Sequence, residues 1–431
     1  MATETVHGAP PLRTHLALCI PAMIVGAVSA AGLFAVEELA HAVEHLLWGT
    51  LPAAWNVDPA SGWWIFGILT LTGVAIGLIV QFAPGHGGAD SATTELIAPP
   101  LRLFAVPSLL VVTVIGLAGG VSLGPEIPII AFNTAVLVAL IGRLRPGIGT
   151  EFVVMVTAAG TIGALFGTPV AAALVFTGVV AGFKGGGALW DRLFLPLVAA
   201  GAGTITMRWL DGPQLPDAGF PELGTPGAAD LVAGIGVTVV ATIIGLGAVY
   251  VFPHAHRFFH GLKNPAIYIA LGGAVLGVLG VLGGPVTLFK GASQMGELIQ
   301  NQGDYSALDL LFIIAVKLAA LVVAAAAGFR GGRIFPAVFI GTAAGLAACA
   351  VVPAIPLGLG LACGILGVVL PVARDGWIAL FIAVVVIGDA TVLPVLCVAI
   401  LPAWLLVSRA PEMLIHTEAV AGPKEPPTGQ A

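Results

Sequence analysis

The chain has 431 residues, of which 58% are hydrophobic and only 9% are charged, and its mean hydropathy is +1.06. A soluble domain carries about 25% charged residues, so this composition excludes a soluble globular protein and predicts an integral membrane protein. The formal net charge is −6, and the sparse Lys and Arg residues form no basic stretch of the kind that binds nucleic acid.

Apolar segments of spanning or near-spanning length follow one another along the chain. The first begins near His15 and is too long for the core of a signal peptide, so we expect it to be retained as a membrane helix. The expected helices cover about residues 15–48, 62–83, 103–118, 127–142, 152–165, 168–183, 193–210, 228–252, 266–283, 308–327, 335–351, 353–372, 376–392 and 393–408. Several fall short of the roughly 20 residues that a full crossing needs, and many are interrupted by Gly or Pro. Because broken helices at membrane depth must be buried in protein or line a cavity, this pattern predicts a transport fold.

Two pairs of matching segments indicate an internal repeat. LTGVAIGL at 71–78 has the glycine spacing of LGGAVLGV at 271–278, and GPEIP at 124–128 shares a GxxxP frame with GRIFP at 332–336. Such Gly- and Pro-interrupted segments at corresponding places in two halves point to a substrate site near the middle of the membrane. We therefore expect an N-terminal segment (1–14), a first membrane half (15–210), a linker (211–228), a second membrane half (229–412) and a disordered tail (413–431).

Each GxxxP frame is typical of a helix start. Proline is favoured in the first turn of a helix, where its missing N–H is not needed, and glycine lets the backbone approach a ligand closely. The free N–H groups carry partial positive charge, so two such starts that meet can bind an anion without a full positive charge. Glu126 lies in the first frame, where its carboxylate could occupy the place of an anion and could also carry a proton. The alternative is an acid that only stabilises the dipole of its own helix.

Other polar residues lie close to glycine-rich breaks or inside apolar runs. His86 and Asp90, in GHGGADSATTEL, either line an anion path, with His86 titrating near neutral pH, or belong to a solvated helix start. Arg330 and Arg333 flank the glycines of AGFRGGRIFP, where they either draw anions into a vestibule or are ordinary interface residues. Lys317 lies inside FIIAVKLAALVV; a structural ion pair or snorkelling is our first interpretation, with a place on the ion path as the alternative. The four cysteines lie singly in apolar runs, so we expect packing thiols and no metal site.

Four stretches resemble signatures of the CLC family of chloride channels and chloride/proton antiporters. GHGGADS, SLGPEIP and GGRIFP resemble the three anion-binding signatures, and FGTPVAAALVF at 166–176 resembles a helix between them. The order and spacing agree over about residues 15–412, and the resemblance is nearest to a bacterial branch. It implies an all-α polytopic membrane protein whose two inverted-repeat halves contain many tilted and broken helices. It also implies a homodimer with one pore in each subunit, in a bacterial inner membrane.

The resemblance assigns roles to individual residues. Glu126 matches the gating glutamate of the family. The residues that match its anion-binding positions are His86, Gly87, Gly124, Pro125, Ile127, Ile334 and Phe335. His86 stands where many relatives have a serine, and Pro125 and Ile127 replace a basic residue and a glycine. Met413 stands near the expected place of a tyrosine, and Val179 stands where antiporters have an inner glutamate.

These observations predict CLC-type transport of an anion, with chloride as the first candidate and Glu126 as the gate. Proton-coupled antiport is the alternative, in which His86 or Asp90 replaces the inner relay, and fluoride or nitrate is the alternative substrate. A third interpretation keeps the fold as a scaffold or sensor without transport. The chain has no HExxH, GxSxG or paired catalytic carboxylates, so we expect neither an enzyme nor a cofactor. The expected partners are a small anion, protons, a second copy of the chain and lipid.

Overall fold

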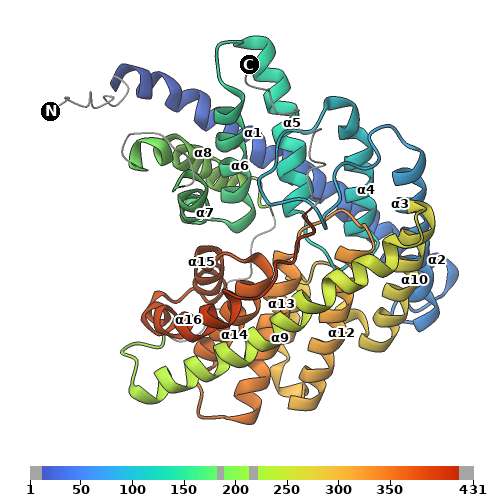
Figure 1. Cartoon of the computed structure of the whole chain (residues 1–431). Helices are drawn as coiled ribbons and strands as arrows, with labels where there is room; N and C mark the ends of the chain where they lie inside the picture. The colour runs from blue at the N-terminus through green and yellow to red at the C-terminus, as the bar shows by residue number, and fades with distance from the viewer. Residues whose placement is uncertain (1–11, 182–188, 213–221, 417–431) are drawn as a thin grey trace, which may run out of the picture.

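The structure, a computed structural model, describes residues 12–181, 189–212 and 222–416 (Figure 1). Over these residues the chain forms α-helices and short 3-10 or π turns, and the one β-type pairing is an isolated bridge between Gly124 and Gly332. Eight of the described helices are long and apolar enough to cross a membrane, and shorter apolar helices accompany them. The predicted all-α polytopic membrane fold is therefore confirmed.

The helices follow one another along the whole described chain. In order they are α1 (Leu12–His45), α2 (Leu51–Trp55), α3 (Gly62–Phe82), α4 (Val106–Ala118), α5 (Glu126–Leu144), α6 (Thr150–Phe166), α7 (Pro169–Ala181), α8 (Leu189–Trp209), α9 (Ala228–His260), α10 (Pro265–Gly283), α11 (Ala292–Gln300), α12 (Ala307–Ala326), α13 (Ile334–Val351), α14 (Leu357–Ala373), α15 (Gly376–Ile387) and α16 (Leu393–Val407). A π turn, Leu46–Thr50, joins α1 to α2.

Most of the expected apolar segments coincide with these helices to within a few residues. The differences have local causes. α14 begins at Leu357, later than the expected 353, because Pro356 forms its N-cap. α11 was not expected, because its nine residues ASQMGELIQ contain no long apolar run.

The two segments of the first predicted repeat pack directly against each other. α3 and α10 run antiparallel, with Gly73 opposite Gly273 and Gly77 opposite Ala266. A Cβ atom on Gly73 would lie 2.8 Å from the Cα of Gly273, and a Cβ on Gly273 would lie 2.8 Å from the Cα of Gly73. Side chains do not approach a backbone this closely, so glycine is what allows the contact. Its symmetry is what two halves related by an approximate two-fold axis produce.

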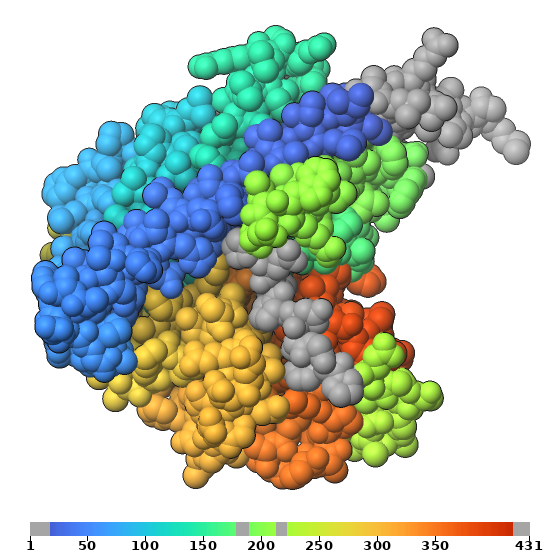
Figure 2. Space-filling model, turned by 180° about the vertical axis from the view of Figure 1, so that it is seen from behind, coloured from blue at the N-terminus to red at the C-terminus, as the bar shows by residue number. Residues whose placement is uncertain are grey.

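Helix α13 is the central element of the fold. Of its apolar window 78% is buried inside the protein, whereas the other candidate spans have between 33% and 50% buried. α12 and α14 pack along it. Figure 1 shows the helices of the first half, from blue to green, beside those of the second half, from yellow to red. Seen from behind, α1 lies across the surface of the first half (Figure 2).

The N-terminal segment and the linker were expected at 1–14 and 211–228. α1 already begins at Leu12, and residues 1–11 lie outside the described chain. The linker connects α8 to α9, and its residues 213–221 also lie outside the described chain.

The tail that we expected to be disordered from residue 413 is ordered at its start. Met413 is only 2% exposed, and the N–H of Ile415 donates to the carbonyl oxygen of Ala92 over 2.7 Å. These contacts fix residues 413–416 against the loop before α4, which corrects the expectation for this part. Residues 417–431 lie outside the described chain.

A methyl group at Gly73 is expected to destabilise the fold. In Gly73→Ala the new Cβ pushes α3 and α10 apart, and overpacking of this kind costs about 1–3 kcal/mol of unfolding free energy. Thermal unfolding of the purified protein in detergent measures this as a lower melting temperature. Gly67→Ala, also in α3, is the control, because a Cβ there meets no atom within 4 Å. Equal melting temperatures of the two variants would contradict the close contact.

Candidate functional site

Two hydrogen bonds join the starts of α5 and α13. The N–H of Gly124 donates to the carbonyl oxygen of Gly332 over 2.8 Å, and the N–H of Gly332 donates to the carbonyl oxygen of Gly124 over 2.6 Å. These glycines open the two GxxxP frames, and the helices begin two residues later, at Glu126 and Ile334. The bridge therefore holds the N-termini of two helices from different halves side by side.

Glu126 reaches from one helix start to the other. Its side chain is 0% exposed, and its Oε1 accepts a hydrogen bond of 2.9 Å from the N–H of Phe335 in α13. Its Oε2 is also buried and has no hydrogen-bond partner among the described residues. The carboxylate thus bonds the backbone of the opposite helix, which is more than an acid that only stabilises its own helix would do.

Glycine is required on both sides of this carboxylate. A Cβ atom on Gly124 or on Gly332 would overlap with Oε2 of Glu126. The missing side chains leave a cradle, formed by Gly124 and Gly332, that fits a carboxylate oxygen or a small anion.

The amides at the two helix starts supply the positive potential of the cradle. The first N–H groups of a helix have no acceptor within it and carry partial positive charge. In α5 these belong to Glu126 and Ile127, since Gly124 donates into the bridge and Pro125 has no N–H. In α13 they belong to the first two residues of the helix. The predicted anion-binding residues that offer such donors are Ile127, Ile334 and Phe335.

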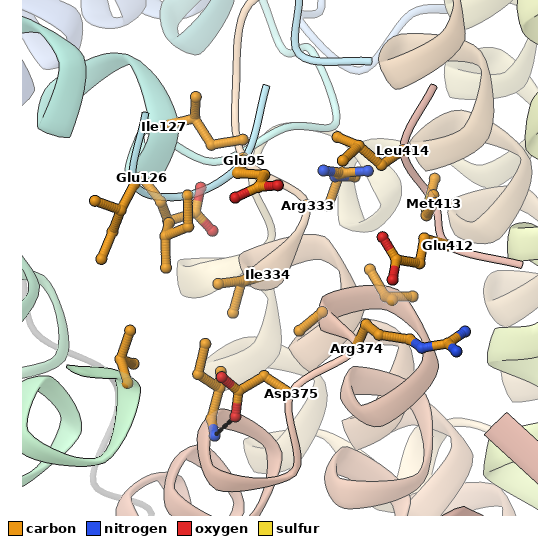
Figure 3. A pocket seen from close by; sticks show the side chains of 17 residues that line it. Glu95, Glu126, Ile127, Arg333, Ile334, Arg374, Asp375, Glu412, Met413 and Leu414 are labelled. Carbon is orange, nitrogen blue, oxygen red and sulfur yellow. Dashed lines mark hydrogen bonds between the residues drawn. The ribbon is translucent and has the colours of Figure 1, made fainter. Parts of the chain in front are cut away.

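A pocket of about 470 Å³ opens next to Glu126 (Figure 3). Its charged lining residues are Glu95, Glu126, Arg333, Arg374, Asp375 and Glu412. Met413 faces it together with Ile127 and Ile334. A second pocket of about 440 Å³ shares Glu95, Ile97 and Ile127 with the first. Glu126 therefore borders a space that has charges of both signs and room for small ions.

His86 and Gly87 do not line either pocket in this structure. His86 is exposed, its backbone φ is 51°, and its Nδ1 donates to a carbonyl oxygen at the end of α3. The N–H of Gly87 donates to a serine hydroxyl of α4. Ser91 lines the second pocket instead, and its Oγ accepts a hydrogen bond of 2.7 Å from the N–H of Gly331. A role of His86 and Gly87 in anion binding stays a prediction.

Asp90 belongs to an ionic cluster with His260 and Arg330. Its Oδ2 lies 3.3 Å from Nε2 of His260, and its Oδ1 lies 3.8 Å from Nη1 of Arg330. Because Nδ1 of His260 donates to the carbonyl oxygen of His256, the ring needs a second proton, on Nε2, to donate to Asp90. Burial favours the neutral acid, but the hydrogen bond from His260 and the charge of Arg330 outweigh it and hold the pKa of Asp90 below its ordinary value.

The same cluster is where the described residues could hold a metal ion. Ligand atoms of Asp90, His256 and His260 all lie within 4.8 Å of one another. The guanidinium of Arg330 beside Asp90 disfavours a second cation, and ion pairing alone accounts for the arrangement.

The two arginines that flank the second-half glycines have different environments. Arg330 borders the second pocket, and its guanidinium donates to the carbonyl oxygens of Gly87 and Gly328 over 3.2 and 2.7 Å. It therefore ties the loop before α4 to the loop before α13. Arg333 lines the first pocket, as Figure 3 shows, where its charge faces the space beside Glu126.

Lys317 is buried deep in α12 and lines neither pocket. Its Nζ donates to the carbonyl oxygens of Thr287, Leu288 and Phe289 over 2.7–2.9 Å. This differs from the ion pair or snorkelling that we expected, because three carbonyl dipoles take the place of an acid. Lys317 thus fixes the chain before α11. The side chain of Val179 lies outside the described residues.

Sequence reasoning missed a partly buried ion pair close to Glu126. Nζ of Lys290, in the loop before α11, lies 2.7 Å from Oε1 of Glu37 in α1, and it lies over the ring of Phe335 at 5.6 Å from the centroid. The stretch VEELAHAVEH contains several acids, so its pattern does not tell which one faces inward. LFKGAS mixes apolar and polar residues and shows no clear pattern. Only the packing of distant elements brings the two charges together.

Comparison with known proteins agrees with this geometry. Residues 71–408 match the family model described as voltage gated chloride channel. The chain belongs to the voltage-gated chloride channel family. Within it, an Escherichia coli protein (strain 55989) that bears the provisional name of ion-transport protein YfeO is 46% identical over 409 residues. That match covers 94% of this chain and 97% of the relative.

Solved CLC structures share the fold at low sequence identity. A CLC-type fluoride/proton antiporter has a TM-score of 0.74 at 17% identity, with 94% of this chain and 98% of the other covered. A slow cyanobacterial Cl⁻/H⁺ antiporter has a TM-score of 0.75 at 16% identity, with 90% and 93% covered. The expected CLC-type fold is therefore confirmed. Since these two antiporters differ in their anion, the fold alone does not select one.

Gly332→Ala is expected to displace Glu126. The new Cβ would overlap with Oε2, so the carboxylate leaves the N–H of Phe335, and that buried donor loses its acceptor at a cost of about 1–3 kcal/mol. A structure of the variant shows the new side-chain position, and a thermal melt shows the loss of stability. Gly142→Ala, in α5, is the control because a Cβ there meets no atom within 4 Å. An unmoved Glu126 would refute the cradle.

Asp90→Asn is expected to weaken the fold in a pH-dependent way. Because the folded protein lowers the pKa of Asp90, the carboxylate stabilises the fold above its unfolded pKa of about 3.9. This stabilisation is lost as the pH falls through the lower, folded value. The variant should melt below the wild type at pH 7, and the difference should vanish in strong acid. Asp304→Asn, at an exposed residue, should show no such trend; a constant difference at every pH would exclude the ion pair as its cause.

Proposed function

We propose that this protein carries a small monovalent anion across the membrane, with chloride as the first candidate and Glu126 as the gate. One observation carries the proposal: the carboxylate of Glu126 is 0% exposed and accepts the N–H of Phe335 at the start of the opposite helix. A carboxylate oxygen and a halide ion bind the same kind of donor. Glu126 therefore occupies the place that a permeant anion needs.

The cradle suits an ion that must leave again. Each helix end contributes a partial charge of about half an elementary charge, so an anion is attracted without being held by a fixed cation. For the anion to enter, the carboxylate of Glu126 turns away from the cradle, and a proton on it removes the negative charge that repels the anion. Arg333 and Arg374, at the wall of the pocket, offset part of the repulsion from the acids that also line it.

The lining of the pocket supports chloride before fluoride. None of the described residues that line the 470 Å³ pocket carries a hydroxyl, and Ile127, Ile334 and Met413 form an apolar part of its wall. Beside this apolar part, an anion exchanges its water for backbone amides and apolar contacts. Chloride and nitrate shed water more readily than fluoride, so they fit this exchange better.

Proton-coupled antiport is the second candidate function. Glu126 can take up a proton when it leaves the cradle, and Oδ2 of Asp90 lies 3.3 Å from Nε2 of His260. Ser91, the neighbour of Asp90, lines the second pocket. The pair is thus a candidate for the relay that Val179 cannot provide. The two solved antiporters share this fold, which supports the same possibility.

A homodimer remains part of the proposal. Large apolar side chains stay exposed on α8 and α16, including Trp209 at 81% and Leu405 at 72%. Lipid or a second copy of the chain can cover such surfaces.

Glu126→Gln tests the gate. Glutamine keeps the shape of the side chain but has neither its charge nor its titratable proton, so anion flux should rise several-fold and lose its pH dependence. The measurement is efflux of chloride, nitrate and fluoride from proteoliposomes, with proton movement recorded at the same time. Glu151→Gln, an exposed acid in the first turn of α6, is the control and should behave as wild type.

The outcomes separate the candidate functions. If none of the three anions moves in the wild type, the proposed function fails. Proton uptake that a chloride gradient drives, and that Glu126→Gln abolishes, establishes antiport. Chloride efflux without proton movement establishes a channel.

A further inference from the structure

The ion pair between Glu37 and Lys290 lies in the interior of the protein. Nζ of Lys290 is 2.7 Å from each carboxylate oxygen of Glu37, and the two side chains are only 17% and 6% exposed. Glu37 belongs to the first candidate membrane span. Ionisable groups at such places are costly, and they mark ion or proton pathways more often than structural supports.

The pair lies next to the cradle but outside the pocket. Phe335 connects the two places: its N–H bonds the carboxylate of Glu126, and its ring lies under the ammonium of Lys290 at 5.6 Å. Neither Glu37 nor Lys290 lines the 470 Å³ pocket. Phe335 therefore contacts both the carboxylate of Glu126 and the ammonium of Lys290.

The loop that carries Lys290 is held in place from several directions. Lys317 binds three successive carbonyl oxygens that end at Phe289. The N–H of Phe289 donates to the carbonyl oxygen of Gly120, just before the bridge of the cradle, over 3.0 Å. Gly291 follows with φ +93°, and a Cβ there would lie 2.9 Å from the Cβ of Phe339. The ammonium of Lys290 is thus presented by a fixed backbone.

We propose that the ammonium of Lys290 is a second binding site for a small monovalent anion, and that Glu37 occupies it in this structure as an internal competitor. The inference rests on the proposed anion transport and extends it by one site. Glu37 would do for Lys290 what Glu126 does for the helix ends: both carboxylates take the place of a permeant anion.

Charge balance connects this site to protons. With Glu37 ionised the pair is neutral, and an added anion would leave a buried net negative charge. When Glu37 takes up a proton, the pair becomes positive, and one bound anion restores neutrality. One proton and one anion are therefore taken up together. The other acids that interact electrostatically with the pair are Glu44, which lies 3.6 Å from His41, and Glu126.

Bromide is the probe for this site, because its anomalous X-ray scattering locates it. We expect a bromide peak at hydrogen-bond distance from Nζ of Lys290 in Glu37→Gln at neutral pH and in the wild type at acidic pH. The wild type at neutral pH should have no peak there. Glu38→Gln, which changes the neighbouring, exposed acid of α1, is the matched control and should resemble the wild type.

Chloride binding in solution provides the second measurement. By calorimetry, Glu37→Gln should bind chloride at least about tenfold more tightly than Glu37→Gln with Lys290→Gln. Lys290→Arg keeps the cation and should keep the site, so Glu37→Gln with Lys290→Arg should bind chloride about as tightly as Glu37→Gln. A missing bromide peak in Glu37→Gln, or equal chloride affinities, would overturn the inference and leave the pair a structural tie. Absent flux in the wild type would count against the proposed function alone, because these binding measurements do not depend on transport.

Discussion

The two hydrogen bonds between Gly124 and Gly332 are the constraint on which the site depends. They form the one β-type pairing of the described chain, and they join two helix starts from different halves. Because α5 and α13 begin two residues beyond the bridge, their N-termini cannot separate unless both bonds break. This short connection brings the first amides of both helices close together. It also places the N–H of Phe335 within reach of the Glu126 carboxylate.

Three buried or half-buried charged groups near the site are stabilised by partners of different kinds. Glu126 bonds a helix amide, Lys317 bonds three carbonyl oxygens, and Lys290 bonds a carboxylate. An unpaired charge in such surroundings is costly, so each needs a partner, but the partner decides what the charge can do. Backbone carbonyls cannot leave or titrate, which makes Lys317 a structural residue. A carboxylate can turn away or be neutralised, so the partners of the helix ends and of Lys290 are exchangeable.

Local patterns explain what the sequence could predict. Apolar runs and their Gly and Pro interruptions are properties of one continuous segment. The bounds of α3 and α10 and the start of α5 at Glu126 were therefore predicted to within a residue. The pairing of Glu37 with Lys290 was not predicted, because it depends on how distant elements pack. The position of His86 depends on its backbone: with φ at 51°, the ring turns toward α3, and no motif reveals that. α11 is too short and too polar to be recognised from hydropathy.

The internal repeat is incomplete at its centre. Glu126 and Ile334 are both the first residue of their helix, and they correspond in the two GxxxP frames, but only one of them is an acid. Two identical halves related by an axis in the membrane plane would offer the same chemistry to both sides. Since one half alone supplies the carboxylate, an ion that arrives past α5 meets an acid, and one that arrives past α13 meets an aliphatic side chain. Although the two halves have nearly the same fold, the two sides of the cradle therefore differ in their chemistry, and the ion path has a direction.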